Sequence, residues 1–132
     1  MAIPVESAMQ MVRTAHTRAA QLDIAVTAVV VDQSGRMVAL GRMDRARPIT
    51  VEMALNRAYT AASFQQPSQE LNGVSGQAWF QSLVVSSNGR IMAGGGAIPV
   101  SEGGNVVGAV AVAGGTDEQD QQCAEVALAS YV

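Results

Sequence analysis

Hydrophobic residues recur every three or four positions over the first twenty residues of the chain. The stripe that they form also contains the single histidine, and its members are Val5, Met9, Val12, His16, Ala19 and Leu22. The opposite side is polar and carries Glu6, Gln10, Arg13, Thr17 and Gln21. Such spacing is typical of an amphipathic helix that rests on a core. The pattern therefore predicts a first helix over residues 5–21.

Short apolar runs separated by turn residues follow this helix. Residues 25–31 (AVTAVVV) have the character of a buried strand, and a tight turn (DQSG) leads into a returning strand over residues 36–42. Helical spacing then resumes over residues 51–64, with Thr50 as the expected N-cap. Alanines are frequent in this second helix, so we expect it to pack closely against a sheet.

The next part of the chain is rich in glycine and turn residues. After Pro67 we predict a short helical turn and loop over residues 68–76. Residues 79–85 (WFQSLVV) are interpreted as a third strand, although this short apolar run is ambiguous, and residues 90–93 as a short strand. The glycine-containing segments that follow, residues 94–99 and 101–105, are expected to form a loop and a hairpin turn.

The last part of the chain predicts one more strand and one more helix. Residues 106–112 (VVGAVAV) are continuously apolar, as in a strand covered on both faces. Thr116 and Gln119 form a Thr-x-x-Gln capping box, which predicts a helix start. The hairpins in this order of elements predict an α+β fold, with a mainly antiparallel sheet and helices on its faces. We expect one domain over residues 1–132.

Composition narrows the possible classes of protein. With 48% hydrophobic and 14% charged residues, the chain is expected to be globular. No apolar run approaches the ~20 residues that span a bilayer, and no signal-peptide pattern is visible. The single cysteine, Cys123, excludes an internal disulfide and suits a reducing compartment. We therefore expect a cytoplasmic protein with no membrane partner.

The charged residues exclude several kinds of chemistry. All eight basic residues are arginine, so lysine Schiff-base catalysis is excluded. One cysteine and one histidine cannot build a structural zinc site within one chain. The acidic pI of about 4.9 and the five aromatic residues argue against nucleic-acid binding.

Two groups of residues are candidates for a ligand site. His16 is the strongest nitrogen ligand of the chain and could hold a haem iron from the first helix, or could be a hydrogen-bonded core or interface histidine. Arg42, Arg45 and Arg47 surround Asp44, and their guanidinium groups match carboxylates. This loop could bind haem propionates or a small carboxylic acid, or could be a solvated loop. Asp44 could also orient an arginine or act as a general base.

The glycines and the last helix supply weaker candidates. Gly94, Gly95 and Gly96 would let the backbone approach a ligand or a second subunit closely, or could form a bend in the sheet. Thr116 is interpreted mainly as a helix cap, with a role in ligand binding as the alternative. Cys123 is expected to be a small buried side chain.

Four ordered motifs resemble one protein family. They are VVVDQSGRMVALGRMD at 29–44, ALNRAYTAA at 54–62, GGGAIPV at 94–100 and VGAVAVAGGTDEQD at 107–120. Together they are similar to the GlcG/HbpS-like haem-binding family, which includes the C-terminal domain of PduO-type cobalamin adenosyltransferases. The resemblance implies a profilin-like three-layer α-β-α sandwich with a five-stranded antiparallel sheet. It also implies homo-oligomers and, in some members, a haem-binding histidine in the first helix.

Three functions follow as hypotheses. The first is a binding protein for haem or a related tetrapyrrole, with His16 near the iron and Arg42 or Arg45 on the carboxylates. One histidine allows five-coordinate iron, or six-coordinate iron if two subunits share one haem. The second is a small catabolic or accessory enzyme that uses Arg42 as an anchor and Asp44 or His16 as acid or base. The third is an assembly partner without a ligand.

Overall fold

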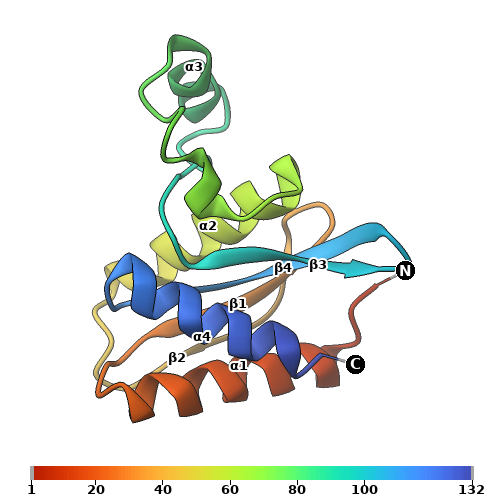
Figure 1. Cartoon of the computed structure of the whole chain (residues 1–132), viewed down its shortest axis with the longest axis vertical. Coiled ribbons are helices and arrows are strands. Elements are labelled where there is room, and N and C mark those ends of the chain that lie inside the picture. Colours follow the sequence, from red (N-terminus) through yellow and green to blue (C-terminus); the bar gives the residue numbers. More distant parts are fainter. Residues whose placement is uncertain (1, 132) are drawn as a thin grey trace.

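An antiparallel sheet of four strands lies at the centre of the molecule, with helices on both faces (Figure 1). The structure is a computed structural model that describes residues 2–131. Its elements are α1 (Val5–Gln21), β1 (Thr27–Asp32), β2 (Met37–Arg42), α2 (Ile49–Phe64), the 3-10 helix η1 (Ser68–Leu71), α3 (Ala78–Ser86), β3 (Ala97–Glu102), β4 (Asn105–Ala113) and α4 (Asp117–Ala129). Within residues 2–131, none of the helices is long and apolar enough to cross a membrane.

The strands lie in the order β2-β1-β4-β3, and each neighbouring pair is antiparallel. Val30 of β1 pairs with Ala39 of β2 on one side and with Val110 of β4 on the other. The expected α+β class and antiparallel sheet are confirmed. The expected fifth strand is wrong, because the described residues form four strands.

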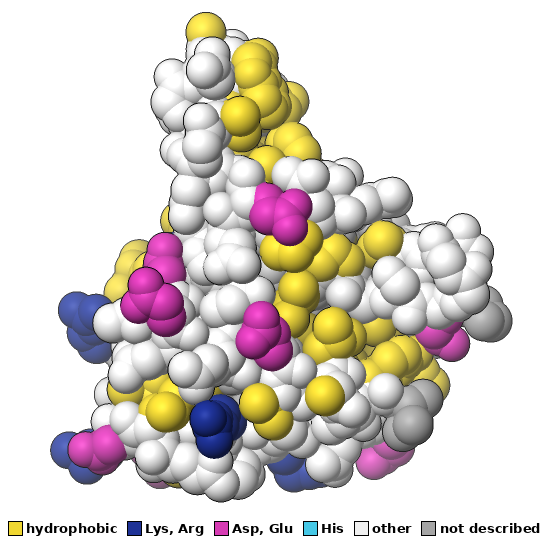
Figure 2. Space-filling model, viewed as in Figure 1, with side chains coloured by type: hydrophobic (Ala, Val, Ile, Leu, Met, Phe, Trp, Pro, Cys, Tyr) yellow, Lys and Arg dark blue, Asp and Glu magenta, His cyan; other side chains and the backbone are white. Residues whose placement is uncertain are grey.

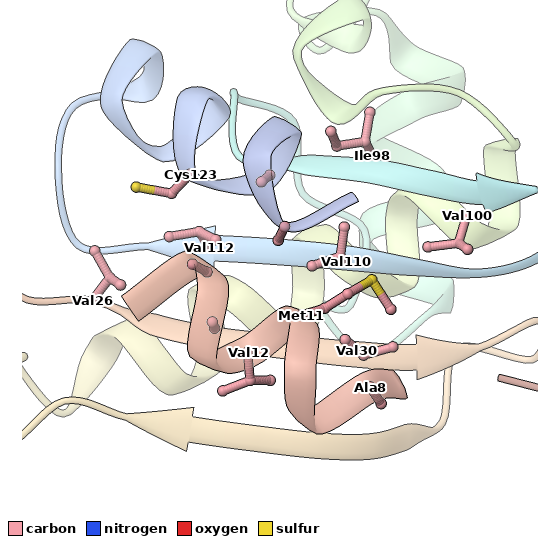
Figure 3. Packing of buried hydrophobic residues seen from close by; sticks show 14 of the residues in the cluster. Ala8, Met11, Val12, Val26, Val30, Ile98, Val100, Val110, Val112 and Cys123 are labelled. Atoms are coloured by element: carbon pink, nitrogen blue, oxygen red, sulfur yellow. The ribbon is translucent and has the colours of Figure 1, made fainter. Parts of the chain in front are cut away.

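The two faces of the sheet are packed with side chains of different size. Toward α1 and α4 the core contains larger side chains, including Met11, Val30 and Val110 (Figure 3). Toward α2 it is built mostly from alanines of the helix and of β4, such as Ala58 and Ala111. Small side chains on both surfaces let α2 lie close to the strands, as its alanine content predicts.

Residues 79–85, predicted to be a strand, lie in the helix α3. This helix and its flanking loops project from the sheet as an arm, which we define as residues 65–93 (Figure 1). Phe80 of α3 is buried and contacts Phe64 of α2, and Val84, one turn later, joins the same cluster. The i, i+4 spacing of Phe80 and Val84 suits a helix that packs one side. A short apolar run is compatible with either structure, so its periodicity did not distinguish them.

The predicted strand over residues 90–93 is also wrong, because side chains of α2 bind this segment instead of a neighbouring strand. Thr60 accepts a hydrogen bond from Met92 N at 2.8 Å, and Arg57 Nε donates to Ala93 O at 3.2 Å. Strand β3 instead begins at Ala97, within the expected loop over 94–99. It is an edge strand and contains Pro99, which is consistent with the preference of proline for sheet edges.

The two predicted helix caps have different outcomes. Thr116 caps α4 as expected, since its side chain accepts from Gln119 N and the Gln119 side chain accepts from Thr116 N. Thr50 is not the cap of α2, which begins at Ile49. The Thr50 hydroxyl instead hydrogen-bonds the hydroxyl of Thr27 in β1 at 2.8 Å and donates to Arg47 O. Thr50 therefore fastens α2 to the sheet.

Candidate functional site

His16 lies on α1 beside strand β2, with its side chain half-buried. Its Nε2 atom is 2.8 Å from the carbonyl oxygen of Gly41. Because a carbonyl oxygen only accepts, Nε2 carries the proton of the neutral ring and the lone pair lies on Nδ1. Within residues 2–131, Nδ1 makes no hydrogen bond. The imidazole is therefore oriented by the sheet and keeps one free nitrogen.

Gly41 has no side chain and so leaves the space beside β2 that the imidazole occupies. A Cβ atom at position 41 would lie 2.8 Å from His16 Cε1 and 2.9 Å from Val12 Cγ1, closer than real Cβ atoms come to other atoms. Any larger residue would push the histidine away from β2. Sequence analysis did not select Gly41, although glycine inside a strand often marks a close approach.

Two separate hollows lie along α1 and β2, and His16 lines the smaller one. The smaller, of about 200 Å³, is lined by Met9, Val12, Arg13, His16, Ala39 and Leu40. The larger, of about 620 Å³, begins one helical turn later and is lined by Ala20, Asp23, Ile24, Ala25, Met43, Asp44 and Arg45. We call these two hollows together the α1–β2 groove. His16, Asp44 and Arg45 thus belong to one surface.

Arg42 lies on the other face of the sheet. It pairs with Thr27 of β1, and directly paired residues of antiparallel strands point to the same face. Thr27 contacts Thr50 of α2, whereas His16 belongs to α1 on the opposite face. The structure therefore separates Arg42 from His16.

The other residues of the arginine loop are exposed. Asp44 and Arg45 line the larger hollow, and Arg47 precedes α2, where its carbonyl accepts from Thr50. Within the described residues, none of the loop's arginines forms an ion pair with Asp44. Arg13 of α1, which sequence analysis did not select, lines the smaller hollow beside His16. Sequence analysis placed Arg13 on the polar side of this helix, but its i−3 spacing from His16 makes the two residues neighbours on the helix surface.

Gly94, Gly95 and Gly96 pack against other parts of the protein itself, both side chains and backbone. A Cβ at Gly94 would lie 2.7 Å from Arg57 Nη2, and one at Gly95 would lie 2.8 Å from Asp117 O. Gly94 and Gly96 also have positive φ values of 104° and 125°, which favour glycine. The backbone does approach other atoms closely here, but these atoms belong to α2, α4 and β4 of the same chain. A role of the three glycines in binding a ligand or a second subunit stays a prediction. None of the three lines the α1–β2 groove.

A charged cluster with a buried Arg57–Asp120 pair and a more exposed Asp117 lies under these glycines. Asp120 of α4 is 1% exposed and accepts a hydrogen bond from Gly115 N at 2.8 Å. Arg57 Nη1 is 4.0 Å from Asp120 Oδ2, and Arg57 Nη2 is 3.8 Å from Asp117 Oδ1. Burial raises the pKa of Asp120 from 3.8 to about 6, although Gly115 and Arg57 oppose the rise.

Sequence analysis missed this cluster. The sequence feature that could have revealed it is Arg57, a charged residue on a helix whose buried side is otherwise mostly alanine and threonine. Cys123 is buried as expected, and burial raises the pKa of its thiol to about 11. It is therefore a neutral, unreactive side chain at ordinary pH.

Comparison with known proteins identifies the family. The family model described as "Haem degrading protein HbpS-like" matches residues 3–129. A 15.0 kDa protein of Citrobacter freundii, from the dhaT-dhaS intergenic region, is 36% identical over 96% of this chain and 89% of its own length. The corrinoid adenosyltransferase PduO of the same organism is 29% identical over 98% of this chain, which spans 39% of PduO.

A solved structure of the PduOC:heme complex agrees with this result. It superposes with a TM-score of 0.90 at 29% identity and covers 98% of this chain and 95% of its own. The family model, the sequence relatives and the fold of this chain agree with the resemblance of its four motifs. The chain therefore belongs to the HbpS-like family.

Proposed function

We propose that the protein binds haem, or a closely related tetrapyrrole, in the α1–β2 groove with His16 as axial ligand. The observation that carries the proposal is the position of His16, which lines the smaller hollow and has a ring nitrogen, Nδ1, without a hydrogen bond among the described residues. The likeness to a solved PduOC:heme complex supports the choice of ligand. A bound haem would supply an iron centre whose reactivity depends on its axial ligand.

The residues present in the groove fit such a group. Metal-binding histidines commonly donate their second ring N–H to a backbone carbonyl, and His16 makes this hydrogen bond to Gly41. His16 can offer iron Nδ1 as it stands, or Nε2 after releasing Gly41.

The groove also has groups suited to the edges of a tetrapyrrole. Arg13 and Arg45 are exposed beside the two hollows and would pair with propionate carboxylates. Met9 and Met43 supply apolar contact surface in the same hollows. Arg42 has no part in this arrangement because it lies on the opposite face.

Exposed apolar side chains near the groove support a homo-oligomer. Val5 and Met9 of α1 are large apolar residues with 52% and 40% of their surface exposed. A second copy placed against this surface would cover them and could bring a second His16 to the same iron. Sedimentation should then show particles larger than the 13.6 kDa chain. A monomer with and without haemin would contradict this part of the proposal.

We also propose a cytoplasmic location, because Cys123 is a free thiol and free thiols persist in a reducing compartment.

Haemin titration followed by Soret absorbance tests the proposal. We expect a saturable shift near one haem per one or two chains, lost in His16→Ala. Thr17→Ala, which removes an exposed neighbour on the same helix, serves as the matched control and should titrate normally. A shift that survives in His16→Ala would exclude His16 as the ligand, and the absence of any saturable shift would exclude the function.

Turnover of the bound haem is a second candidate function, favoured by the description of the family as haem-degrading. We would follow the Soret band of the complex in air with ascorbate, against free haemin. A faster loss in the complex would support turnover.

The alternative of an enzyme acting on small carboxylated metabolites required Arg42, Asp44 and His16 around one substrate. Because Arg42 lies on the other face, the geometry does not support that site.

A further inference from the structure

A cleft lies where the arm meets α2. It has a volume of about 400 Å³, near the lower end of the ~300–1,000 Å³ that is common for small-molecule sites. Phe64 at the end of α2, Leu83 of α3 and Ile91 after α3 supply apolar walls. The cleft is on the α2 side of the sheet, away from His16, so it is independent of the proposed haem site.

Arg90 places a positive charge at this cleft. Its guanidinium carbon lies 4.3 Å from the centre of the Tyr59 ring, and its Nε donates to Ser87 O at 2.8 Å. These contacts orient the guanidinium group. Within residues 2–131, its two terminal nitrogens make no hydrogen bond or ion pair. They are the part of the fork that binds carboxylates.

Tyr59 gives Arg90 a rigid support. Gly35 in the β1–β2 turn has a φ of 79°, and a Cβ atom there would overlap the Tyr59 ring. The ring is thus held between Gly35 and Arg90. A cation that is already oriented by its neighbours needs less ordering when a ligand binds, which lowers the entropic cost of binding.

The charges around the cleft select the class of ligand. No acidic side chain lines it, and Glu70 is the only charged residue between positions 64 and 89. A single free guanidinium matches one carboxylate bidentately, and a ligand with one negative charge leaves no charge unpaired at a cleft that holds one cation. The apolar walls require an apolar body on the same molecule.

We propose that this cleft binds small apolar monocarboxylates, with the carboxylate on Arg90 and the apolar body against Phe64, Leu83 and Ile91. The ligand would bridge α2 and α3 and so hold the arm against the sheet. Hydrophobic surface is visible on the arm in Figure 2. Leu83 of the arm is 39% exposed. Such a ligand would shield some of it from water.

Trp79 offers a direct readout. It is the only tryptophan of the chain, and its ring centre lies 6.4 Å from that of Phe64 in the cleft wall. We would titrate the protein with phenylacetate and follow Trp79 fluorescence. We expect a saturable change, with a Kd on the order of 1 mM for so small a ligand. The Soret spectrum of haemin-loaded protein should not change, because the two sites lie on opposite faces.

Two comparisons test the role of the charge. Arg90→Gln should weaken phenylacetate binding roughly tenfold or more, whereas Arg36→Gln, at an exposed arginine in the β1–β2 turn, should leave it unchanged. Phenylacetamide, a neutral analogue, should bind the wild-type protein at least as weakly as phenylacetate binds Arg90→Gln. This second comparison does not depend on the folding of a variant.

Three results would overturn the proposal. One is equal binding of phenylacetate and phenylacetamide, and another is the absence of any saturable change in fluorescence. The third is a Trp79 signal that depends on protein concentration without ligand, since a second copy of the chain would then occupy the cleft.

Discussion

Gly41 matters because His16 occupies the space beside it. A methyl group at Gly41 would meet the imidazole and Val12. We predict that Gly41→Ala costs about 1 kcal/mol or a little more in stability and weakens haemin binding, because the ring loses its position beside β2. Thermal unfolding and Soret titration measure the two effects. Gly73→Ala is the control, since a Cβ there has no neighbour within 4 Å. Unchanged haemin binding in Gly41→Ala would show that the position of the imidazole beside β2 is not needed for haemin binding.

Asp120 makes the stability of the protein depend on pH. Its folded pKa of about 6 exceeds the ordinary value of 3.8, so between these pH values the folded state binds the proton more tightly. The contribution of Asp120 to the free energy of unfolding is therefore greatest below about pH 4 and is lost as the pH rises through 6. The loss amounts to about 3 kcal/mol as an order of magnitude. The charged groups facing Asp120 are Arg57 and Asp117.

Urea unfolding at pH 5, 6 and 7 tests this linkage. We predict that the difference in unfolding free energy between wild type and Asp120→Asn changes in favour of the variant as pH rises. The amide has no charge to desolvate, and it keeps an oxygen that can accept from Gly115. A difference that stays constant from pH 5 to pH 7 would mean that Asp120 does not titrate in this range.

Among the elements, α4 depends most clearly on local sequence. Its capping box satisfies two backbone N–H groups, those of Thr116 and Gln119. Thr116→Ala should lower the unfolding free energy by about 1 kcal/mol without changing haemin binding, because Thr116 lies outside the α1–β2 groove. Ser82→Ala, at an exposed serine of α3, is the control in the same urea experiment. A loss of haemin binding in Thr116→Ala would restore Thr116 as a ligand residue.

The elements also show where local sequence stops being sufficient. Helices α1 and α4 and strands β1, β2 and β4 follow from periodicity and capping residues. Residues 90–93 did not, because Thr60 and Arg57 of α2 take hydrogen bonds that a neighbouring strand would otherwise make. Those partners lie some thirty residues away, and tertiary contacts of this kind leave no trace in a local pattern.

For the whole molecule, the family and the α+β class could be predicted from ordered motifs, while the composition of the site could not. Sequence proximity grouped Arg42 with Asp44 and Arg45, but alternation along β2 turns Arg42 toward α2. The structure adds Arg13 and Gly41 to His16 through contacts between α1 and β2. The three-dimensional pairing of a helix with a strand therefore decides which residues share the groove.

The single histidine of the chain permits a direct test of the central claim, that His16 binds the haem iron in this groove. Protein grown with ring-15N-labelled histidine carries the label at one residue, whereas added haemin carries natural nitrogen. We would record pulsed electron paramagnetic resonance of the ferric haem complex and look for 15N hyperfine coupling. The proposed ligation predicts the strong coupling of a directly bonded 15N nitrogen. Bound haem without that coupling would contradict it.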